Sequence, residues 1–290
     1  MNQVAREQIA GHTAEAVYAG LDRLRDVLMA WDSVLVAFSG GVDSAVVLAV
    51  AHEALGARAV AFTAESPTLP AEEAEIAKAI CAQLGVRHLV MESNELDREG
   101  YRANAGNRCY FCKSELFEIA QRVASEEGIA VVVDGTILDD LGDHRPGLVA
   151  AEELQVGHPL VDAQFDKGLV RAAAQHLGLP VWDKPSFACL GSRFPAGTEV
   201  TLDRVTKIGR VERLVRLVGV RQFRVRFHEV DGQTMVRIEV GEEDIQRISA
   251  PRVRRQLVAA CKNEGFHWVT LDLEGYRTGT SSPSMADLSD

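Results

Sequence analysis

The chain has 290 residues, 47% hydrophobic and 25% charged, so one or two domains that bury roughly 75% of the unfolded surface are expected. Its formal net charge of −11 argues against a protein that coats nucleic acids. With no apolar stretch long enough to span a bilayer and no apolar signal-peptide core in its first residues, it is expected in the cytoplasm.

The first predicted elements are a helix and a strand. Apolar residues recur at helical spacing over residues 14–31. Residues 34–38 form an apolar run typical of a strand that is buried on both faces of a parallel sheet. A glycine-rich loop follows directly, and an apolar helix begins near Ala45. The order strand, glycine loop and helix is typical of sites that bind phosphate.

The loop has the chemistry of a pyrophosphate site. Gly40 and Gly41 have no Cβ, so backbone N–H groups can approach an anion. No lysine follows the glycines, which argues against a Walker A loop. We interpret Asp43 as holding the loop amides or placing Mg²⁺, and an ordinary strand-to-helix turn is the alternative. The predicted nucleotide-binding residues of the loop are Ser39, Gly40, Gly41, Val42, Asp43 and Ser44.

The string Ser-Gly-Gly-Val-Asp-Ser at residues 39–44 resembles the signature of the PP-loop ATP pyrophosphatases. The resemblance implies cleavage of ATP between the α and β phosphates, with transfer of AMP to an acceptor oxygen. It leaves the acceptor open, because the superfamily includes amidating synthetases, RNA thiolases and sulfur transferases that act on small molecules.

Strands and helices then alternate, which predicts an α/β fold with a doubly wound parallel sheet. Ligands of such sheets bind beyond the carboxyl ends of the strands. Ser66, Asp134, Gly135 and Thr136 follow predicted strands and are therefore further candidates for nucleotide contact, although Asp134 could instead cap the next turn. The predicted strands are 58–64, 87–91 and 130–134, and the predicted helices are 70–84 and 109–127.

The pattern changes near residue 201 and predicts a smaller α+β domain. A helix with one apolar face covers 205–218, and two alternating segments joined at Asp231-Gly232 predict a hairpin. A helix at 251–263 and a strand at 268–273 complete this domain. The predicted divisions are a PP-loop domain at 1–200, the α+β substrate or oligomerisation domain at 201–278, and a disordered tail at 279–290.

Basic residues are concentrated in the second domain. Arg224 and Arg226 alternate along a predicted strand and point to one side, where guanidinium groups suit a substrate phosphate or carboxylate. Arg237 and Glu239 on the neighbouring strand are weaker candidates. A solvated helix face is the simpler explanation of a further basic row formed by Arg204, Lys207, Arg210, Arg213 and Arg216.

Three cysteines are candidate metal ligands. Cys109 and Cys112 form Cys-x-x-Cys at the start of a predicted helix, and Cys189 follows far along the chain. Three thiolates can hold a [4Fe–4S] cluster with one iron open. Structural zinc, completed by His88, His144 or His158, and an exposed pair without a role are the alternatives. The other two cysteines, Cys81 and Cys261, lie in apolar helical contexts and are predicted core residues.

Several motifs together resemble the LarE family. These are the loop string, Arg-Cys-Tyr-Phe-Cys-Lys at 108–113, Asp-Gly-Thr-x-x-Asp-Asp at 134–140, Asp-x-Arg-Pro-Gly at 143–147 and Trp-Asp-Lys-Pro-Ser-x-Ala-Cys-Leu-x-Ser-Arg at 182–193. The motifs extend from about residue 34 to residue 194, and the second domain fits more loosely. Members are sulfur insertases that act on pyridinium-3,5-biscarboxylic acid mononucleotide in the biosynthesis of the nickel-pincer nucleotide, the cofactor of lactate racemase.

The resemblance implies ATP, Mg²⁺ and adenylylation of a substrate carboxylate before sulfur replaces its oxygen. In single-cysteine members the residue matching Cys189 gives up its own sulfur and becomes dehydroalanine. This chain resembles instead the three-cysteine members, in which a [4Fe–4S] cluster held by Cys109, Cys112 and Cys189 carries sulfide. Asp43 and Cys189 are the implied catalytic residues.

Further expectations concern the substrate and the partners. Ser192 and Arg193, just after the third cysteine, could contact a phosphate or the thiol. A homo-oligomer and a sulfide donor that reloads the cluster are expected, without nucleic acid or membrane. The functional alternatives are an RNA thiolase, an amidating synthetase and a non-catalytic metal-binding regulator.

Overall fold

The computed structural model describes residues 8–9, 11–142, 146–185 and 188–276. The chain divides into two compact units, Met1–Glu95 with Cys109–Phe187 and Leu96–Arg108 with Ala188–Asp290. The division thus falls before the expected residue 200, and an earlier segment belongs to the second unit. The predicted tail at 279–290, together with His144 and the start of the motif at 143–147, lies outside the described residues. Among the described helices, none is both long and apolar enough to cross a membrane.

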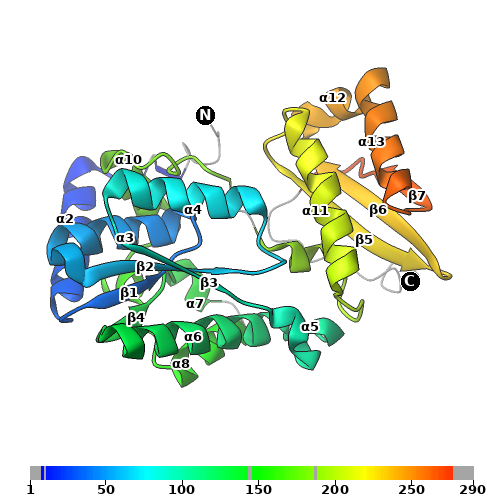
Figure 1. Ribbon diagram of the computed structural model, residues 1–290. Helices are drawn as coiled ribbons and strands as arrows, with labels where there is room; N and C mark the ends of the chain where they lie inside the picture. Colours follow the sequence, from blue (N-terminus) through cyan, green and yellow to red (C-terminus); the bar gives the residue numbers. More distant parts are fainter. Residues whose placement is uncertain (1–7, 10, 143–145, 186–187, 277–290) are drawn as a thin grey trace. The chain divides into compact units, whose positions relative to one another are not determined.

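A parallel sheet forms the centre of the first unit (Figure 1). Its strand order is β3-β2-β1-β4, and every pairing is parallel. The strands are β1 (Val34–Ala37), β2 (Ala59–Glu65), β3 (His88–Glu92) and β4 (Val131–Val133). All four lie within a residue or two of the predicted strands, so the predicted α/β class with a parallel sheet is confirmed.

Helices cover both faces of this sheet. Alternate residues of β1 explain the two layers, because Val34 and Val36 belong to one buried cluster and Leu35 to another. The first cluster packs against α2 (Ala14–Met29), α3 (Val42–Leu55), α4 (Ala71–Leu84) and α10 (Lys167–His176). The second packs against α6 (Arg108–Glu127) and α8 (Pro146–Glu153). Figure 1 shows α3 and α4 on one side of the strands and α6 and α8 on the other.

Short helices between residues 138 and 176 were not predicted from the sequence. The four-residue helices α7 (Leu138–Leu141) and α9 (Pro159–Asp162) complete barely one turn, so no apolar periodicity can reveal them. The longer α8 and α10 were also missed. The α10 helix is capped by Asp166, whose carboxylate accepts the N–H of Leu169 at 2.7 Å. Further short elements are η1 (Gly56–Arg58), η2 (Glu95–Asp97) and α5 (Glu99–Ala103).

The second unit contains a three-stranded sheet with the order β5-β6-β7. The β5 strand (Phe223–Val230) pairs antiparallel with β6 (Gln233–Val240), and β7 (Trp268–Leu271) pairs parallel with β6. Asp231 and Gly232 have φ of 51° and 73°, as the predicted hairpin requires. The remaining elements are η3 (Leu190–Arg193), α11 (Leu202–Leu217), η4 (Glu242–Asp244), α12 (Ile245–Ser249) and α13 (Pro251–Asn263).

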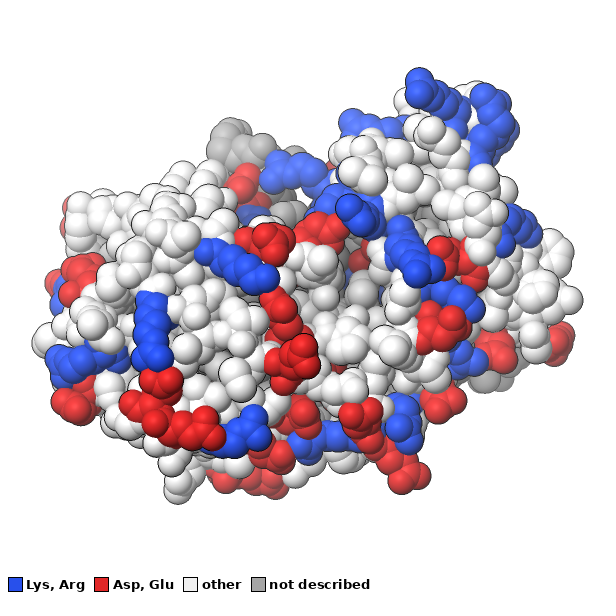
Figure 2. Space-filling model, in the orientation of Figure 1, with Lys and Arg blue, Asp and Glu red and all other residues white. Residues whose placement is uncertain are grey.

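The basic row on α11 is largely neutralised by neighbouring acids. Arg204 binds Glu229 at 2.6 Å, and Lys207 binds Asp203 at 2.7 Å. Such exposed pairs contribute little to stability, which agrees with a solvated helix face. Figure 2 shows Lys and Arg side chains gathered over α12 and α13, where Arg252, Arg254 and Arg255 are exposed.

Candidate active site

The turn between β1 and α3 presents backbone amides at the start of a helix. Gly40 has φ +70°, in the left-handed region that favours glycine. Gly41 is the N-cap residue of α3, which continues for 14 residues. The first N–H groups of a helix have no partner within it and lie at the positive end of its dipole. This geometry fits the phosphate cradle predicted at residues 39–44, although nucleotide contact stays a prediction.

Close packing holds the turn in shape. A Cβ atom at Gly135 would lie 2.6 Å from the backbone N of Ser44, nearer than two such atoms can pack. A Cβ atom at Gly40 would lie 3.2 Å from both Ala77 N and Glu73 O of α4. The segment after β4, the loop after β1 and the helix α4 therefore approach one another along their backbones, and the glycines at 135 and 40 permit these approaches.

Asp43 forms an ion pair that the sequence did not predict. The Nζ of Lys167 lies 2.8 Å from Asp43 Oδ1 and 2.7 Å from Oδ2. Lys167 is the first residue of α10, and its backbone N–H donates to Asp139 Oδ2 at 2.9 Å. Both side chains of the pair keep partial exposure, 21% for the lysine and 28% for the aspartate. The carboxylate is therefore accessible to a cation, as a Mg²⁺-placing role requires.

A second lysine reaches the loop itself. Lys184 Nζ donates to the carbonyl of Gly40 at 3.0 Å and to Glu73 Oε2 at 2.6 Å. Arg171 supports this segment, because its guanidinium donates to the carbonyls of Trp182 at 2.7 Å and of Lys184 at 3.0 Å. The loop lacks the lysine of a Walker A sequence, yet two ammonium groups lie beside it. Lys184 belongs to the motif at 182–193 but had no predicted role. No residue near Lys167 in the sequence indicates that this lysine pairs with Asp43.

Asp134 is buried and fully engaged. Its Oδ1 accepts the N–H of Thr136 at 3.0 Å and a bond from His158 Nδ1 at 2.8 Å, and its Oδ2 accepts the Thr136 hydroxyl at 2.8 Å. Burial acts to raise the Asp134 pKa, but His158, the nearby Lys113 and Thr136 together lower it. The same hydrogen bond raises the pKa of His158. These contacts are those that the capping interpretation predicts, so nucleotide contact by residues 134–136 stays a prediction.

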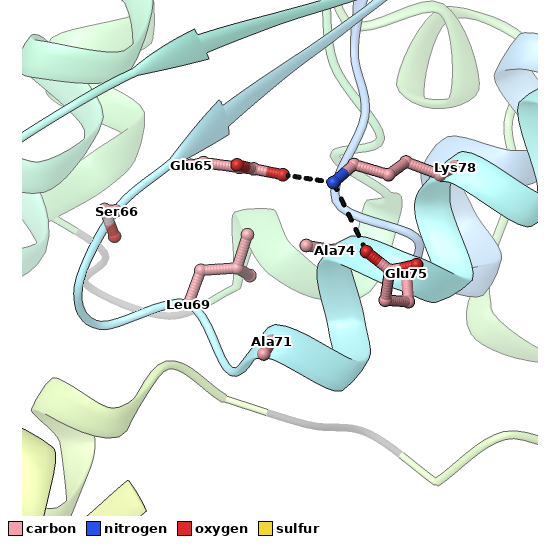
Figure 3. A pocket seen from close by; sticks show the side chains of 7 residues that line it. All are labelled: Glu65, Ser66, Leu69, Ala71, Ala74, Glu75 and Lys78. Atoms are coloured by element: carbon pink, nitrogen blue, oxygen red, sulfur yellow. Dashed lines mark hydrogen bonds and ion pairs between the residues drawn. The ribbon is translucent and has the colours of Figure 1, made fainter.

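A pocket of about 270 Å³ opens where β2 leads into α4 (Figure 3). Ser66 lines it, and the Ser66 hydroxyl donates to Glu95 Oε1 at 2.9 Å. Lys78 lines it too and pairs with Glu65 at 2.9 Å. The other lining residues are Leu69, Ala71, Ala74 and Glu75. Since α4 also packs against Gly40, the pocket and the loop share one helix.

The candidate ligand cysteines occur in both units. Cys109 is exposed and Cys112 half-buried, and both lie in the first turn of α6. Positions i and i+3 of a helix are surface neighbours, so the two thiolates suit one metal site or cluster. Cys189, in the second unit, is the N-cap residue of η3 and half-buried. The described residues contain no group of three or more Cys, His, Asp or Glu placed to hold a metal ion, so the three-cysteine set stays a prediction.

The other candidate metal ligands have different contacts. His88 Nε2 lies 2.8 Å from the Thr63 hydroxyl, and His158 is bound to Asp134. Cys81 and Cys261 are confirmed as core residues, with exposed fractions of 2% and 0%. Burial raises the pKa of each of these two thiols to about 11, so both stay protonated at neutral pH.

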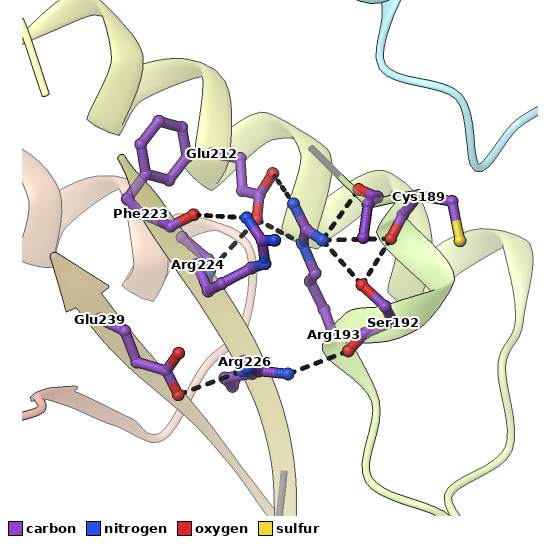
Figure 4. A network of polar contacts seen from close by, with 10 residues as sticks. Cys189, Ser192, Arg193, Glu212, Phe223, Arg224, Arg226 and Glu239 are labelled. Atoms are coloured by element: carbon purple, nitrogen blue, oxygen red, sulfur yellow. Dashed lines mark hydrogen bonds and ion pairs between the residues drawn. The ribbon is translucent and has the colours of Figure 1, made fainter. Parts of the chain in front are cut away.

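Arg193 anchors the backbone beside Cys189 (Figure 4). Its side chain is fully buried and binds Glu212 through two bonds, Nε to Oε1 at 2.7 Å and Nη2 to Oε2 at 3.1 Å. Its Nη1 donates to the carbonyls of Ala188 at 2.9 Å and Cys189 at 3.2 Å and to Ser192 Oγ at 2.8 Å. These bonds occupy the guanidinium, which therefore holds the cysteine loop in place. From the sequence, Arg193 was a candidate contact of a substrate phosphate or of the thiol, and its partner Glu212 was not predicted.

Arg224 and Arg226 lie on one face of β5, as the alternation predicts, and both are buried. Arg226 donates to Glu239 Oε1 at 3.1 Å and to the Ser192 carbonyl at 3.1 Å. Arg224 donates to a carbonyl of its own strand, and its guanidinium lies 5.0 Å from the centroid of the Tyr276 ring. Burial and the nearby Arg193 lower the Arg224 pKa. The two arginines thus remain the candidates for an anionic substrate group.

Glu239 connects the two strands of the hairpin. Besides Arg226, its Oε1 accepts from Arg237 at 2.9 Å. Arg237 also lies 3.6 Å from Asp272, measured from Nε to Oδ2. One carboxylate oxygen therefore binds two guanidinium groups, which leaves this face of the sheet rich in positive charge.

The sequence is similar to several known proteins. Residues 22–103 match the family model described as asparagine synthase. A protein of Synechocystis, described as uncharacterized, is 45% identical over 89% of this chain and 95% of its own length. The pyridinium-3,5-bisthiocarboxylic acid mononucleotide synthase of Lactiplantibacillus plantarum is 36% identical over 87% of this chain and 90% of its own length. A glutamine-hydrolyzing GMP synthase polypeptide from Archaeoglobus fulgidus is 28% identical over 62% of this chain and 63% of its own length.

Proposed function

We propose, because the chain belongs to the family of the pyridinium-3,5-bisthiocarboxylic acid mononucleotide synthase, that it is an ATP-dependent sulfurtransferase of nickel-pincer nucleotide biosynthesis. It is an enzyme with the PP-loop ATP pyrophosphatase fold. Its proposed substrate is pyridinium-3,5-biscarboxylic acid mononucleotide. One observation carries the proposal: the similarity to the synthase extends over 255 residues and so includes parts of both units.

The proposed reaction begins by activating a carboxylate, because this group is a poor electrophile until one oxygen can leave. A carboxylate oxygen attacks the α-phosphorus of ATP, the bond to the bridging oxygen breaks, and pyrophosphate departs with the electron pair. The amides at the start of α3 support this step, because the N-terminus of a helix stabilises negative charge such as that of departing pyrophosphate. Lys184 adds a positive charge beside the loop.

Asp43 is the proposed residue for Mg²⁺. This ion favours one or two carboxylates together with substrate phosphates, and the partly exposed Asp43 on the first turn of α3 fits that need. The bound ion would neutralise phosphate charge. The pocket lined by Ser66 is the proposed position of the nucleoside, because it adjoins the helix that packs on the loop.

Sulfur is proposed to reach the acyl adenylate through a [4Fe–4S] cluster bound by Cys109, Cys112 and Cys189. The chemistry of the donors supports this choice, because two thiols share one helical turn and the third, at the start of η3, is only half-buried. When bound, such a cluster supplies a transferable sulfide at its open iron. Replacement of the adenylate by sulfide releases AMP and leaves a thiocarboxylate. Sacrifice of the Cys189 sulfur, which leaves dehydroalanine, is the alternative.

Arg224 and Arg226 are the proposed residues for an anionic group of the substrate. Their position on one face of β5, close to the Ser192 carbonyl, supports a role near Cys189. Ser192 remains a candidate contact, although its hydroxyl donates to the Cys189 carbonyl at 2.8 Å. Arg193 is proposed to act through position only, because its donors are used within the protein.

Anaerobic purification followed by turnover tests the proposal. We expect iron and acid-labile sulfide in the purified protein, thiocarboxylate and AMP as products, and an unchanged mass of the Cys189 peptide after several turnovers. Cys109→Ser and Cys112→Ser should lose the iron, whereas Cys81→Ala, which removes a buried thiol, should retain it. Absence of iron together with conversion of Cys189 to dehydroalanine would establish the sacrificial route instead.

The nature of the acceptor needs its own control. An RNA thiolase would form AMP with transfer RNA, and its affinity would fall steeply as salt rises. The exposed arginines of α13 are the feature that favours this alternative. We expect AMP formation with the pyridinium mononucleotide and none with RNA, and the reverse result would overturn the proposed substrate.

A further inference from the structure

His228 on β5 has no role in the chemistry described so far. Along a strand, alternate residues share a face, so His228 lies on the same face as Arg224 and Arg226. The opposite face carries Phe223, Val225 and Phe227, which are buried apolar residues. His228 therefore belongs to the polar face of the sheet, two residues beyond Arg226.

The imidazole is buried, and one of its two nitrogens has no hydrogen-bond partner among the described residues. Only 3% of His228 is exposed, and its Nε2 forms no hydrogen bond in the described part of the chain. Glu239 on β6 likewise has a buried Oε2 without a partner among the described residues. Nearly all buried polar groups in native proteins are hydrogen-bonded, so such atoms need an explanation. One such explanation is a bound ligand that supplies the missing hydrogen-bond partner.

The charges around His228 indicate the chemical nature of the ligand. Burial, Arg237 and Arg226 lower the pKa of His228 to about 4, so the ring is neutral at neutral pH. A neutral imidazole has one donor and one acceptor nitrogen. Beside two guanidinium groups, such a ring suits a polar group of an acidic ligand whose negative charge the arginines balance.

Strand geometry sets the spacing. Two residues along a strand advance by roughly 6.7 Å, so side chains from Arg226 and His228 can hold two separate groups of one ligand. A pyridinium mononucleotide carries carboxylate, phosphate and ribose hydroxyl groups on one small frame. A single such molecule could therefore engage both residues.

We propose that His228 is a substrate-binding residue that hydrogen-bonds a second polar group of the pyridinium mononucleotide, next to the anionic group held by Arg226. This inference rests on the proposed function and assigns a specificity role to a residue outside the arginine pair. Two residues of β5, Arg226 and His228, would then contact two groups of the same substrate molecule.

Three variants of the full-length protein test the assignment. His228→Leu keeps much of the side-chain volume but has no polar atom, and a merely structural role would leave binding unchanged because the buried nitrogen has no partner to lose. His228→Gln restores a donor and an acceptor. Met235→Leu is the matched control, since Met235 is directly opposite His228 in the hairpin register and is apolar.

Calorimetric titration with pyridinium-3,5-biscarboxylic acid mononucleotide measures the effect. We expect His228→Leu to raise the Kd at least tenfold while the Kd for ATP is unchanged. His228→Gln should stay within about threefold of wild type, and Met235→Leu should match wild type. In histidine-labelled wild-type protein, the ligand should shift the ¹⁵N resonance of His228.

Different results distinguish a failure of this inference from a failure of the proposed function. An unchanged Kd in His228→Leu, or an unmoved His228 resonance on saturation with the ligand, would overturn this inference and leave the proposed function intact. Failure of the wild-type protein to bind the mononucleotide would overturn the proposed function and this inference with it. If the leucine variant does not fold, the wild-type resonance and the glutamine variant decide.

Discussion

The phosphate loop of the first unit and the arginine network of the second are built in different ways. The loop is shaped by backbone, with glycines that permit close approach and a helix start. Two lysines pair beside it, Lys167 with the partly exposed Asp43 and Lys184 with the buried Glu73. The network is made of buried side chains from η3, α11, β5 and β6. A site made of backbone tolerates the loss of a neighbouring charge, whereas a buried ionic network does not. Substitutions beside the loop should therefore change the reaction rate, and those that leave a buried charge of the network unpaired should lower stability.

The largest expected effect is on the network. Arg193→Leu should lower the free energy of unfolding by about 3–5 kcal/mol, because it leaves the buried Glu212 carboxylate charged and unpaired. Urea unfolding followed by circular dichroism measures the loss. Arg204→Leu, which breaks the more exposed pair with Glu229, is the matched control and should lose less than about 1 kcal/mol. Equal losses in both variants would contradict the contrast between the two regions.

The next effect concerns rate. Asp43→Asn should slow AMP formation by roughly 10²–10³-fold, the range seen when one preorganised electrostatic contact to a transition state is removed. Folding and iron content should be unchanged, because the Asp43 side chain is 28% exposed and its pair with Lys167 is not buried. A pyrophosphate-release assay and iron analysis check both expectations. Loss of iron in this variant would show that Asp43 serves folding rather than phosphate chemistry.

Lys184→Met should have a smaller effect on rate, about 10- to 100-fold on AMP formation, if its ammonium group assists the departing pyrophosphate. The variant also removes the bond to the Gly40 carbonyl. Lys207→Met is a suitable control, since Lys207 lies on α11, outside the proposed nucleotide site, and forms an exposed pair with Asp203. If the melting temperature falls while the rate of AMP formation per folded molecule is unchanged, Lys184 has a structural role only.

The smallest effect depends on pH. Because the pKa of His158 is raised by Asp134, the pair stabilises the fold fully below the ordinary histidine pKa of about 6.5, and the gain is lost as pH rises through the raised value. Asp134, whose pKa is lowered, loses its share only as pH falls through that lowered value. His158→Asn should therefore cost about 1 kcal/mol at pH 6 and less at pH 9. Thermal unfolding at the two pH values checks this, and a difference that does not vary with pH would contradict it.

Local patterns predicted most of the regular structure. The four strands of the first unit, the hairpin at Asp231-Gly232 and the long helices follow from apolar periodicity and turn chemistry, both of which act over a few residues. The four-residue helices α7 and α9 are too short to show such a pattern. The α10 helix does carry one, with Leu169, Val170 and Ala173 buried at helical spacing, but it was not predicted.

The site was predictable only in part, for the same reason. Ser39–Ser44 form a contiguous string, so their geometry could be expected from residue order. The partner of Asp43 is 124 residues away in the chain, and that of Glu73 is 111 residues away. Arg193 illustrates a second limit of prediction from sequence. Its residue type suggested a substrate contact, and only the folded chain shows that Glu212 and two carbonyls bind it.

The anchor at Cys189 involves its carbonyl oxygen and not its sulfur. Arg193 and Ser192 both bind that oxygen, and Figure 4 shows the Cys189 sulfur on the far side of the residue from Arg193. The loop should therefore keep its conformation when the sulfur is replaced by an oxygen or a hydrogen atom. Serine and alanine at this position become single-atom probes of the reaction, and a difference in product between them and the parent enzyme can be attributed to one sulfur atom.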